Sequence, residues 1–408
     1  MRLLLLSLLA CGVLAARAED VHVKLRAIPE AHKANPDSPF ALGVGLSDLG
    51  RDRMQDEVEL RAAVEGINLV ATGRSTAMEG KSPDNELVVN ELYYETTLWG
   101  QRLGGGKKIM SWDVGFGFRP LDVIQQENRR AIFNSTLEGI PFVAWERFEE
   151  TSAWTVLLAN PGRGKAGSPR DDESVAAKAY FRKEQTDWHA VLRASQRHQW
   201  ETGMALTQVS EEGLEWHGSF LYQRRYEKLL NRLAEEPGAL FLASDPMERH
   251  VLANGVKALL GMTWTGTSGI SILAEGWYDR SAYTASEWTA VADLARRQSA
   301  LLGVNGIPEA AVRGNVAYSL RYFEQPNLLQ QNLLARVSWK GESGTMEPAL
   351  DVLYTPQDHG WVATLSAGYE GNRFRIDAGY RVFGGPEDSA YRMLPERRVI
   401  YVAGQFAF

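Results

Sequence analysis

The amino-acid sequence predicts an all-β protein: a transmembrane, antiparallel, up-and-down β-barrel of about 12–16 strands with one short loop helix. Three observations lead to this prediction. Apolar and polar residues alternate at period two over runs of about ten residues, tryptophans lie near the ends of these runs, and the C-terminal strand 399–408 has no polar tail. No stretch after residue 18 approaches the roughly 20 apolar residues of a membrane-spanning helix, so a membrane-embedded form must be a barrel.

The C-terminal strand gives the most specific signal. Ile400, Val402, Phe406 and Phe408 fall on one face. A closed barrel pairs its last strand on both sides and turns one face to lipid. A terminal phenylalanine after alternating hydrophobic residues resembles the address read by the outer-membrane assembly machinery of Gram-negative bacteria. We therefore expect Phe406 and Phe408 to act as a membrane-insertion signal, with outer-membrane lipid and lipopolysaccharide around the barrel and the cell outer membrane as its location.

The N-terminus has the organisation of a secretory signal peptide. A basic start precedes an apolar stretch, Leu3 to Ala16, and Ala16-Arg17-Ala18 fits the small-x-small cleavage rule. Cleavage would remove residues 1–18, including Cys11, the only cysteine, so neither a disulfide nor a Cys-ligated metal site is expected. Leu8-Leu9-Ala10-Cys11 also resembles a lipoprotein box, and this alternative stays open.

The net charge and the spacing of the histidines argue against some classes of binding partner. The formal net charge is −7, and loss of Arg2 and Arg17 with the signal peptide makes it more negative. An acidic secreted chain argues against nucleic acid as a partner. The histidines lack metal-ligand spacing such as His-Glu-x-x-His, so no metal and no cofactor is expected. After the signal peptide we expect an N-terminal segment at 19–56, either periplasmic or containing the first strand, and the barrel at 57–408.

The alternation is clearest in the late part of the chain. Leu333, Val337 and Trp339, for example, oppose Asn332 and Arg336. Candidate strands lie at 21–28, 57–64, 67–72, 92–98, 107–114, 140–148, 154–160, 174–183, 188–195, 201–210, 214–222, 257–265, 268–278, 313–322, 333–340, 345–355, 361–370, 374–382 and 399–408. No repeat of fixed period is present, which indicates one domain.

A soluble β-sandwich would also alternate, with its apolar face inward. Tryptophan placement favours the barrel, because interfacial aromatic girdles put tryptophans near strand ends. The tryptophans that open or end candidate strands are Trp99, Trp188, Trp200, Trp264, Trp277, Trp339 and Trp361.

Some segments break the alternation. Residues 113–139 and 227–254 are long, charged insertions, and Thr284-Ala-Ser-Glu287 is a capping box that should open a helix to about Leu302. In barrels of this kind, long loops usually face outward, and one often folds into the lumen. Gly104-Gly-Gly106 is interpreted as a hairpin turn, since no helix follows to make it a phosphate loop.

The stretch Gly106-Lys-Lys-Ile-Met-Ser-Trp-Asp-Val-Gly-Phe-Gly-Phe-Arg-Pro-Leu-Asp-Val123 resembles a pattern of Gram-negative porin-like and alginate-export-like barrels, in which a Gly-Lys-x-x-x-Ser-Trp-Gly strand precedes an Asn-Pro-x-Asp-Val loop. Gly276-Trp-Tyr-Asp279 with Ser286-Glu-Trp288 is similar to the strand and loop-helix pairing of such proteins. Asp113 and Arg119 depart from the pattern, which leaves the subfamily undecided. The resemblance implies an outer-membrane barrel.

The polar strand faces should line the lumen. The expected lining residues are Arg313, Arg321, Arg336, Lys340, Arg375 and Arg381 from late strands and Glu91 and Glu95 from an early one. Opposed charges across a water-filled lumen set up a transverse field that selects solutes. The sequence therefore predicts a porin-like channel for a small hydrophilic solute, anions included. The alternative is a purely structural role, in which these charges pair with one another and bind no solute.

Asp113, Arg119 and Asp122 are candidates for a loop constriction. A turn held by an arginine–carboxylate bridge is favoured over that role, because Asp beside Gly and Pro most often serves turn geometry.

Two further functions are to be compared with the channel. The competing class is a barrel that docks to periplasmic partners as the outer exit or scaffold of an export system, without a pore of its own. His217 and Ser219 share a strand face at a spacing that resembles outer-membrane phospholipases, but Trp216, Phe220 and Tyr222 should take the lipid side, so catalysis is not expected.

Overall fold

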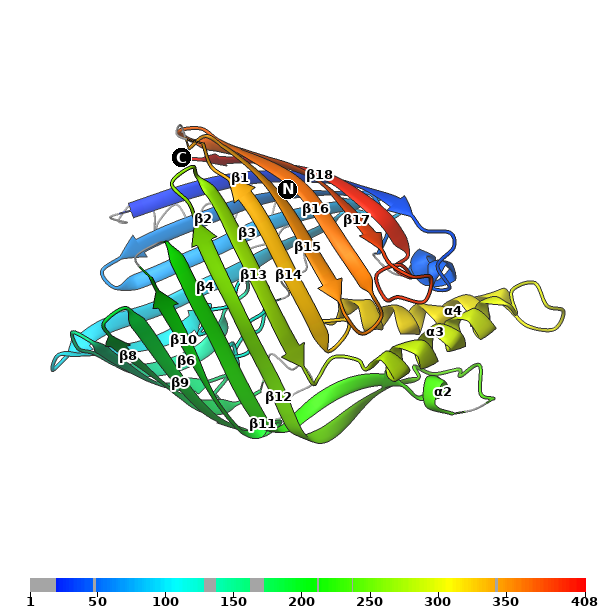
Figure 1. Ribbon diagram of the computed structural model, residues 1–408, viewed down its shortest axis with the longest axis horizontal. Helices are drawn as coiled ribbons and strands as arrows, with labels where there is room; N and C mark the ends of the chain where they lie inside the picture. Colours follow the sequence, from blue (N-terminus) through cyan, green and yellow to red (C-terminus); the bar gives the residue numbers. More distant parts are fainter. Residues whose placement is uncertain are drawn as a thin grey trace.

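A computed structural model describes residues 20–46, 49–127, 137–161, 172–210, 213–236, 238–341 and 344–408. The expected signal peptide and its cleavage site lie outside these ranges. The described residues form one closed antiparallel barrel of 18 strands, in which β1 pairs with both β2 and β18 (Figure 1).

The strands are β1 (Asp20–Ala34), β2 (Arg53–Val64), β3 (Ile67–Met78), β4 (Asp84–Leu98), β5 (Gln101–Lys108), β6 (Ile140–Phe148), β7 (Ser152–Ala159), β8 (Ser174–Lys183), β9 (Thr186–Ser195), β10 (Gln199–Val209), β11 (Leu214–Asn231), β12 (Met247–Thr265), β13 (Ile270–Asp279), β14 (Gln331–Trp339), β15 (Met346–Thr355), β16 (Gly360–Glu370), β17 (Phe374–Gly384) and β18 (Glu396–Ala407). The barrel is therefore confirmed, with more strands than the expected range of about 12–16.

The apolar strand faces point outward. Leu260 on β12, Leu365 on β16 and Ile400 on β18 are 67%, 60% and 51% exposed, whereas the inward Arg193 and Glu275 are 5% and 3% exposed. This is the reverse of a soluble sandwich, which buries its apolar faces. Among the described residues, no helix combines the length and apolar character that a bilayer-spanning helix needs.

Tryptophans form a belt near one end of the barrel. Trp154, Trp188, Trp216 and Trp339 lie beside short turns and are 43–47% exposed. Trp277 was also predicted for this girdle, and that prediction is wrong. It lies on the inward face of β13 with Leu273 and Glu275, so its ring is buried inside the barrel.

The connections at the two ends differ in length. Short turns such as 65–66, 99–100 and 184–185 link strands at one end, while 35–52, 109–139 and 280–330 link them at the other. In outer-membrane barrels short turns face the periplasm and long loops face outward. Phe408 lies at the short-turn end, where its backbone N–H donates to the Val23 carbonyl at 2.9 Å.

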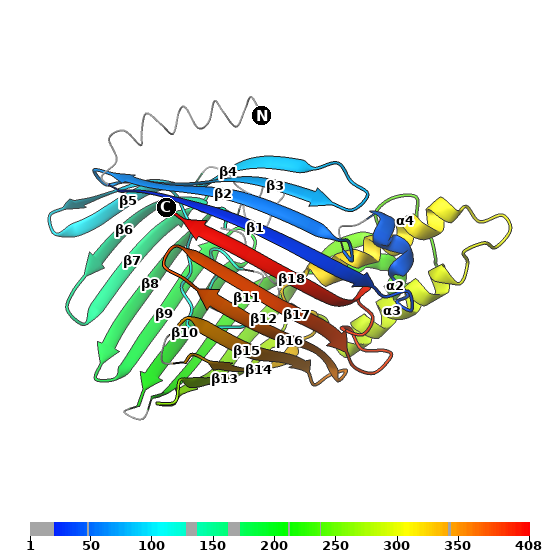
Figure 2. The same ribbon diagram turned by 90° about the horizontal axis from the view of Figure 1, so that it is seen from above.

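Helices gather at the long-connection end, where they project beyond the barrel (Figures 1 and 2). They are the 3-10 helices η1 (Ala41–Leu46) and η3 (Leu320–Glu324) and the α-helices α2 (Arg232–Glu235), α3 (Ala285–Ser299) and α4 (Glu309–Ser319). The predicted capping box is present, because Thr284 and Glu287 each accept a backbone N–H of the other. Trp288 from α3 packs with Phe40 and Phe323 in a core that also contains Leu230 of β11 and Val362 of β16. We call these five helices the helical subdomain.

One predicted strand is a helix. Residues 313–322 were expected to alternate as a strand, but they form α4 and η3. Val312, Val316 and Leu320 recur at spacing four and are at most 2% exposed, so they form the buried stripe of a helix. Pro308, which precedes Glu309 at the N-terminus of α4, was the available start signal.

The predicted turn at Gly104–Gly106 is also wrong, because these glycines lie within β5. The hairpin turn is made instead by Trp99 and Gly100, at φ 51° and 75°. Positive φ at both central residues is the geometry of a type I′ turn. A Cβ on Gly106 would lie 2.3 Å from the Leu92 carbonyl oxygen, so the glycine permits close approach of β4 and β5.

The predicted insertion at 227–254 is strand at both of its ends. β11 continues to Asn231 and β12 starts at Met247, so this hairpin extends past its neighbours toward α2 (Figure 1). Its inward residues Tyr226, Lys228 and Leu230 alternate with more exposed ones, which continues the barrel pattern.

Candidate functional site

Residues 109–127 are the first described part of the connection that follows β5, and they fold into the barrel. We call them the inward segment. It packs on inward-facing residues of the wall. Leu121 contacts Val191, Ala205 and Leu221, and Phe118 stacks on Trp277 at 6.0 Å between ring centroids. The segment therefore covers the inner face of the wall from β9 to β13.

Glycines make room for this docking. A Cβ on Gly203 of β10 would lie 2.4 Å from Leu121 Cδ2, and one on Gly117 would lie 2.7 Å from Leu334 Cδ2. Contacts this short cannot be accommodated without movement. The wall and the inward segment are thus fitted to each other at positions without side chains.

The polar anchor of the inward segment is Glu275 on β13. Its carboxylate accepts the backbone N–H groups of Phe116 and Gly117, both at 2.6 Å. His217 Nε2 on β11 lies 2.9 Å from the same carboxylate. It reaches across β12 at Gly261, where a Cβ would lie 2.3 Å from Nε2. A buried carboxylate with three partners is well satisfied.

Two aspartates accept backbone hydrogen bonds at the bend of the inward segment. Asp122 accepts the Trp112 N–H at 2.5 Å and the Asp113 N–H at 3.1 Å. Asp113 accepts the backbone N–H groups of Val114 and Leu121. Arg119 Nη1 lies 3.9 Å from Asp122. All three residues lie in the inward segment, inside the barrel, and their role in a constriction stays a prediction.

Burial raises the pKa of Asp113 to about 6, with a smaller contribution from the nearby Asp122 charge, against the lowering effect of its backbone hydrogen bonds. The folded protein thus binds a proton at Asp113 more tightly than the unfolded chain does. This group's contribution to stability falls as pH rises from about 4 to about 6.

We expect docking of the inward segment to be more heat-resistant at pH 5 than at pH 7.5. Ser219 and Lys178 face the same aspartate and complete its electrostatic surroundings. Single-channel recording at rising temperature would measure this heat resistance. The temperature at which the current begins to fluctuate marks the release of the inward segment. In Asp113→Asn, which cannot ionise, the part of this pH dependence due to Asp113 should vanish; an unchanged profile would contradict the assignment.

Only some of the charged residues that were predicted to line the lumen lie on inward strand faces in the structure. Arg336, Arg375 and Arg381 lie on inward faces of late strands, as expected. Lys340 follows β14 in a short turn and is exposed. Arg313 bonds Glu309 along α4 and Arg321 pairs with Asp245, both in the helical subdomain. The strand placement of these two arginines is wrong for the reason given above.

The late arginines do not form a purely basic wall. Arg336 pairs with Asp351 on β15 at 3.0 Å, and Arg375 pairs with Asp377 on its own strand at 2.9 Å. Arg381 donates to the Thr364 hydroxyl at 2.9 Å. The inner face of β14–β17 therefore carries both signs of charge.

The two predicted acids face inward on β4 and hold the entrance of the inward segment. Glu91 accepts the backbone N–H of Ile109 at 2.9 Å, and Glu95 pairs with Lys108 at 2.6 Å. Three strands, β1, β2 and β3, separate these two glutamates from β18. The inward charges of these three strands were not among the predicted lining residues. Glu57 on β2 is 4% exposed and bonds Arg26 and Arg74 from the strands on either side.

His217 and Ser219 point inward and Trp216, Phe220 and Tyr222 outward, as predicted. His217 is 2% exposed and its Nε2 is held by Glu275, so its visible role is structural.

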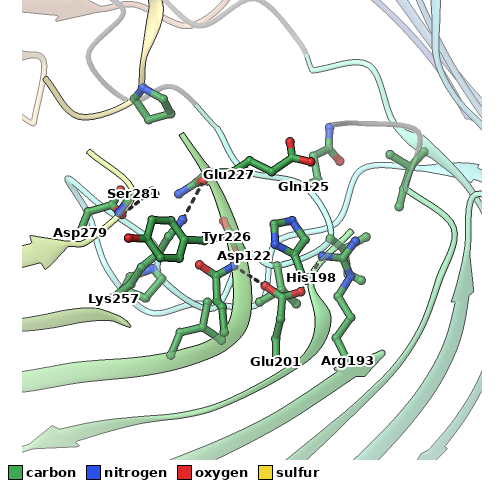
Figure 3. A pocket seen from close by; sticks show the side chains of 18 of the residues that line it. Asp122, Gln125, Arg193, His198, Glu201, Tyr226, Glu227, Lys257, Asp279 and Ser281 are labelled. Atoms are coloured by element: carbon green, nitrogen blue, oxygen red, sulfur yellow. Dashed lines mark hydrogen bonds and ion pairs between the residues drawn. The ribbon is translucent and has the colours of Figure 1, made fainter. Parts of the chain in front are cut away.

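A polar cavity of about 750 Å³ lies between the inward segment and the long connections (Figure 3). Its wall includes Arg193 and Glu201 on one side and Lys257 and Asp279 on the other, with Tyr226 between them. Sequence reasoning missed it because residues from seven separate strands and four connections meet there. The charged residues within the extended β11–β12 hairpin were the available signal.

No protein-family model matches the chain, and no curated protein matches it in sequence. Solved structures do match. Wzi, an outer-membrane protein involved in group 1 capsule assembly in Escherichia coli and described as a carbohydrate-binding β-barrel, has a TM-score of 0.53 at 10% identity, over 99% of this chain and 87% of Wzi.

Two Pseudomonas aeruginosa structures are similar to the same extent. OpdK with vanillate has a TM-score of 0.52 at 10% identity, covering 95% of this chain and 98% of OpdK. OpdH has a TM-score of 0.51 at 10% identity, covering 96% and 98%. This chain thus has the fold of Gram-negative outer-membrane β-barrels, which confirms the predicted architecture and agrees with the predicted location.

Proposed function

We propose that the protein is a porin-like outer-membrane channel for small hydrophilic solutes. The observation that carries the proposal is the inward segment, which packs on the wall from β9 to β13 while charged side chains of β14–β17 stay accessible to water. Arg336 is 27% exposed, Asp351 22% and Arg375 39%, measured on their side chains. Similar barrels include OpdK, crystallised with vanillate.

Conductance of the purified protein in planar lipid bilayers would test this function, together with swelling of liposomes in sugar solutions. We expect discrete conductance steps and solute entry. A folded barrel, recognised by its heat-dependent mobility in gels, that shows neither activity would overturn the proposal.

Arg336→Gln should shift ion selectivity toward cations. The change leaves the Asp351 carboxylate, 3.0 Å away in the wild type, without its partner on the water-exposed face. A lone charge in a narrow lumen attracts counter-ions. Reversal potentials in a salt gradient would measure the shift, and Asp351→Asn should shift selectivity in the opposite direction. Equal reversal potentials for both variants and wild type would place the pair away from the ion path.

A second candidate is an outer exit or scaffold in an export system. The helical subdomain, which projects beyond the barrel (Figure 2), favours it, as does the similarity to Wzi, a capsule-assembly protein. Co-purification of a periplasmic or surface partner, with no conductance from the barrel alone, would support this alternative.

A further inference from the structure

The cavity of about 750 Å³ has a size typical of small-molecule sites, which span roughly 300–1,000 Å³. It lies where the inward segment, the extended β11–β12 hairpin and the connection after β13 meet. If the barrel is a channel, a solute entering from the long-connection end meets this cavity beside the inward segment.

The cavity's charges are compensated from within the protein. Arg193 is 5% exposed and its guanidinium binds Asp172 at 2.9 Å and Glu201 at 2.7 Å. Glu227 takes Arg197 at 3.0 Å and Arg249 at 2.7 Å. A charged ligand would have to compete with these ion pairs, because both the Arg193 guanidinium and the Glu227 carboxylate already have partners of opposite charge.

Two lysines face the cavity from the opposite side. Lys107 pairs with Glu138 at 2.6 Å. Lys257 shares β-ladder register with Asp279, and its ammonium lies 3.4 Å from Gln126 Oε1 and 5.8 Å from the Phe118 ring centroid. The cavity wall thus carries both signs of charge, and most of these charges are held in ion pairs within the protein.

Polar atoms remain available for a neutral ligand. His198 uses Nδ1 on the Arg225 carbonyl at 2.9 Å, which leaves Nε2 for the cavity. Within the described ranges, no group hydrogen-bonds the Tyr226 hydroxyl, although the Tyr226 residue is only 5% exposed and therefore fixed. In Figure 3 Tyr226 lies between the Lys257 and Asp279 side and the His198 and Glu201 side.

We propose that this cavity binds a neutral polyhydroxylated solute, a mono- or oligosaccharide, with the Tyr226 hydroxyl and the His198 imidazole as hydrogen-bonding groups. Sugar hydroxyls both donate and accept, so they match a wall of fixed donors and acceptors whose charges are mostly paired within the protein. The inference rests on the proposed channel function and names the solute class that the channel retains.

The test uses the full-length protein in detergent and in planar bilayers. Glucose, maltose and maltotriose are titrated by calorimetry and added to the long-connection side during current recording; benzoate and arginine serve as charged probes. We expect the sugars to bind and to interrupt the current, and the charged probes to be weaker. Stronger binding of benzoate or arginine than of every sugar would overturn the inference.

Three variants sharpen the test. Tyr226→Phe removes one hydroxyl and should weaken sugar binding about fivefold, the effect of one neutral hydrogen bond. Tyr369→Phe, on the lipid-facing side of β16 and 42% exposed, is the matched control. Lys257→Gln should change sugar affinity less than twofold, whereas an anion site would lose its ligand. Sugar binding that ignores Tyr226→Phe overturns the assignment. Calorimetric binding without conductance would reject the channel but leave the sugar site standing.

Discussion

A Glu275→Gln variant should show larger and noisier single-channel currents than the wild-type barrel. The carboxylate holds the Phe116 and Gly117 N–H groups at 2.6 Å and faces His217. Removing one partner of a buried charged network costs about 3–5 kcal/mol, and this loss weakens the docking of the inward segment on β13. The inward segment should therefore leave the wall for part of the time, which planar-bilayer recording would detect as a widened and fluctuating pore.

Glu215→Gln is the matched control. Glu215 lies two residues from His217 and 3.4 Å from its Nδ1, but its side chain is 39% exposed, so its loss should leave the current unchanged. Currents in Glu275→Gln equal to those of wild type, from a barrel that still runs as folded in gels, would mean that other contacts hold the segment.

Trp288→Ala should unfold the helical subdomain and spare the barrel. Trp288 is 1% exposed and its ring centroid lies 5.9 Å from that of Phe40 and 5.5 Å from that of Phe323. Truncating a buried tryptophan costs about 3–5 kcal/mol, and the barrel strands keep their own ladders of hydrogen bonds. Limited proteolysis should cut between α3 and α4, while heat-dependent gel mobility persists.

Trp99→Ala tests whether the effect is specific. Trp99 is 89% exposed in the β4–β5 turn at the opposite end of the barrel, so its truncation should leave the protease pattern unchanged. Resistance of Trp288→Ala to proteolysis would show that the helices are held by contacts outside this core.

The barrel could be predicted from sequence because strand faces are a local property. Period-two alternation fixes which residues share a face, and outward Leu333 and Val337 against inward Asn332 needed no knowledge of the neighbours. The capping box at Thr284 is equally local, since both of its hydrogen bonds join residues three apart.

The incorrect predictions share one cause. In each, contacts between residues far apart in the sequence decide which structure a local pattern adopts. Residues 313–322 fit period two as well as the spacing of four that Val312, Val316 and Leu320 follow, and packing in the core with Phe40 and Trp288 favours the helix. Trp277 has the strand-end position of a girdle residue, but its stacking on Phe118 reveals the inner side. Pairing of Arg336 with Asp351 depends on cross-strand register, which the sequence alone did not define.

The bare positions at Gly117 and Gly203 have a consequence for how the inward segment and the wall can evolve. Gly117 of the segment faces Leu334 of β14, and Gly203 of β10 faces Leu121 of the segment. A change at one member of such a pair alters the fit of the other. Hybrids that graft the 109–127 stretch of one homologue into the strands of another should thus dock this stretch less well unless both pairs are exchanged together.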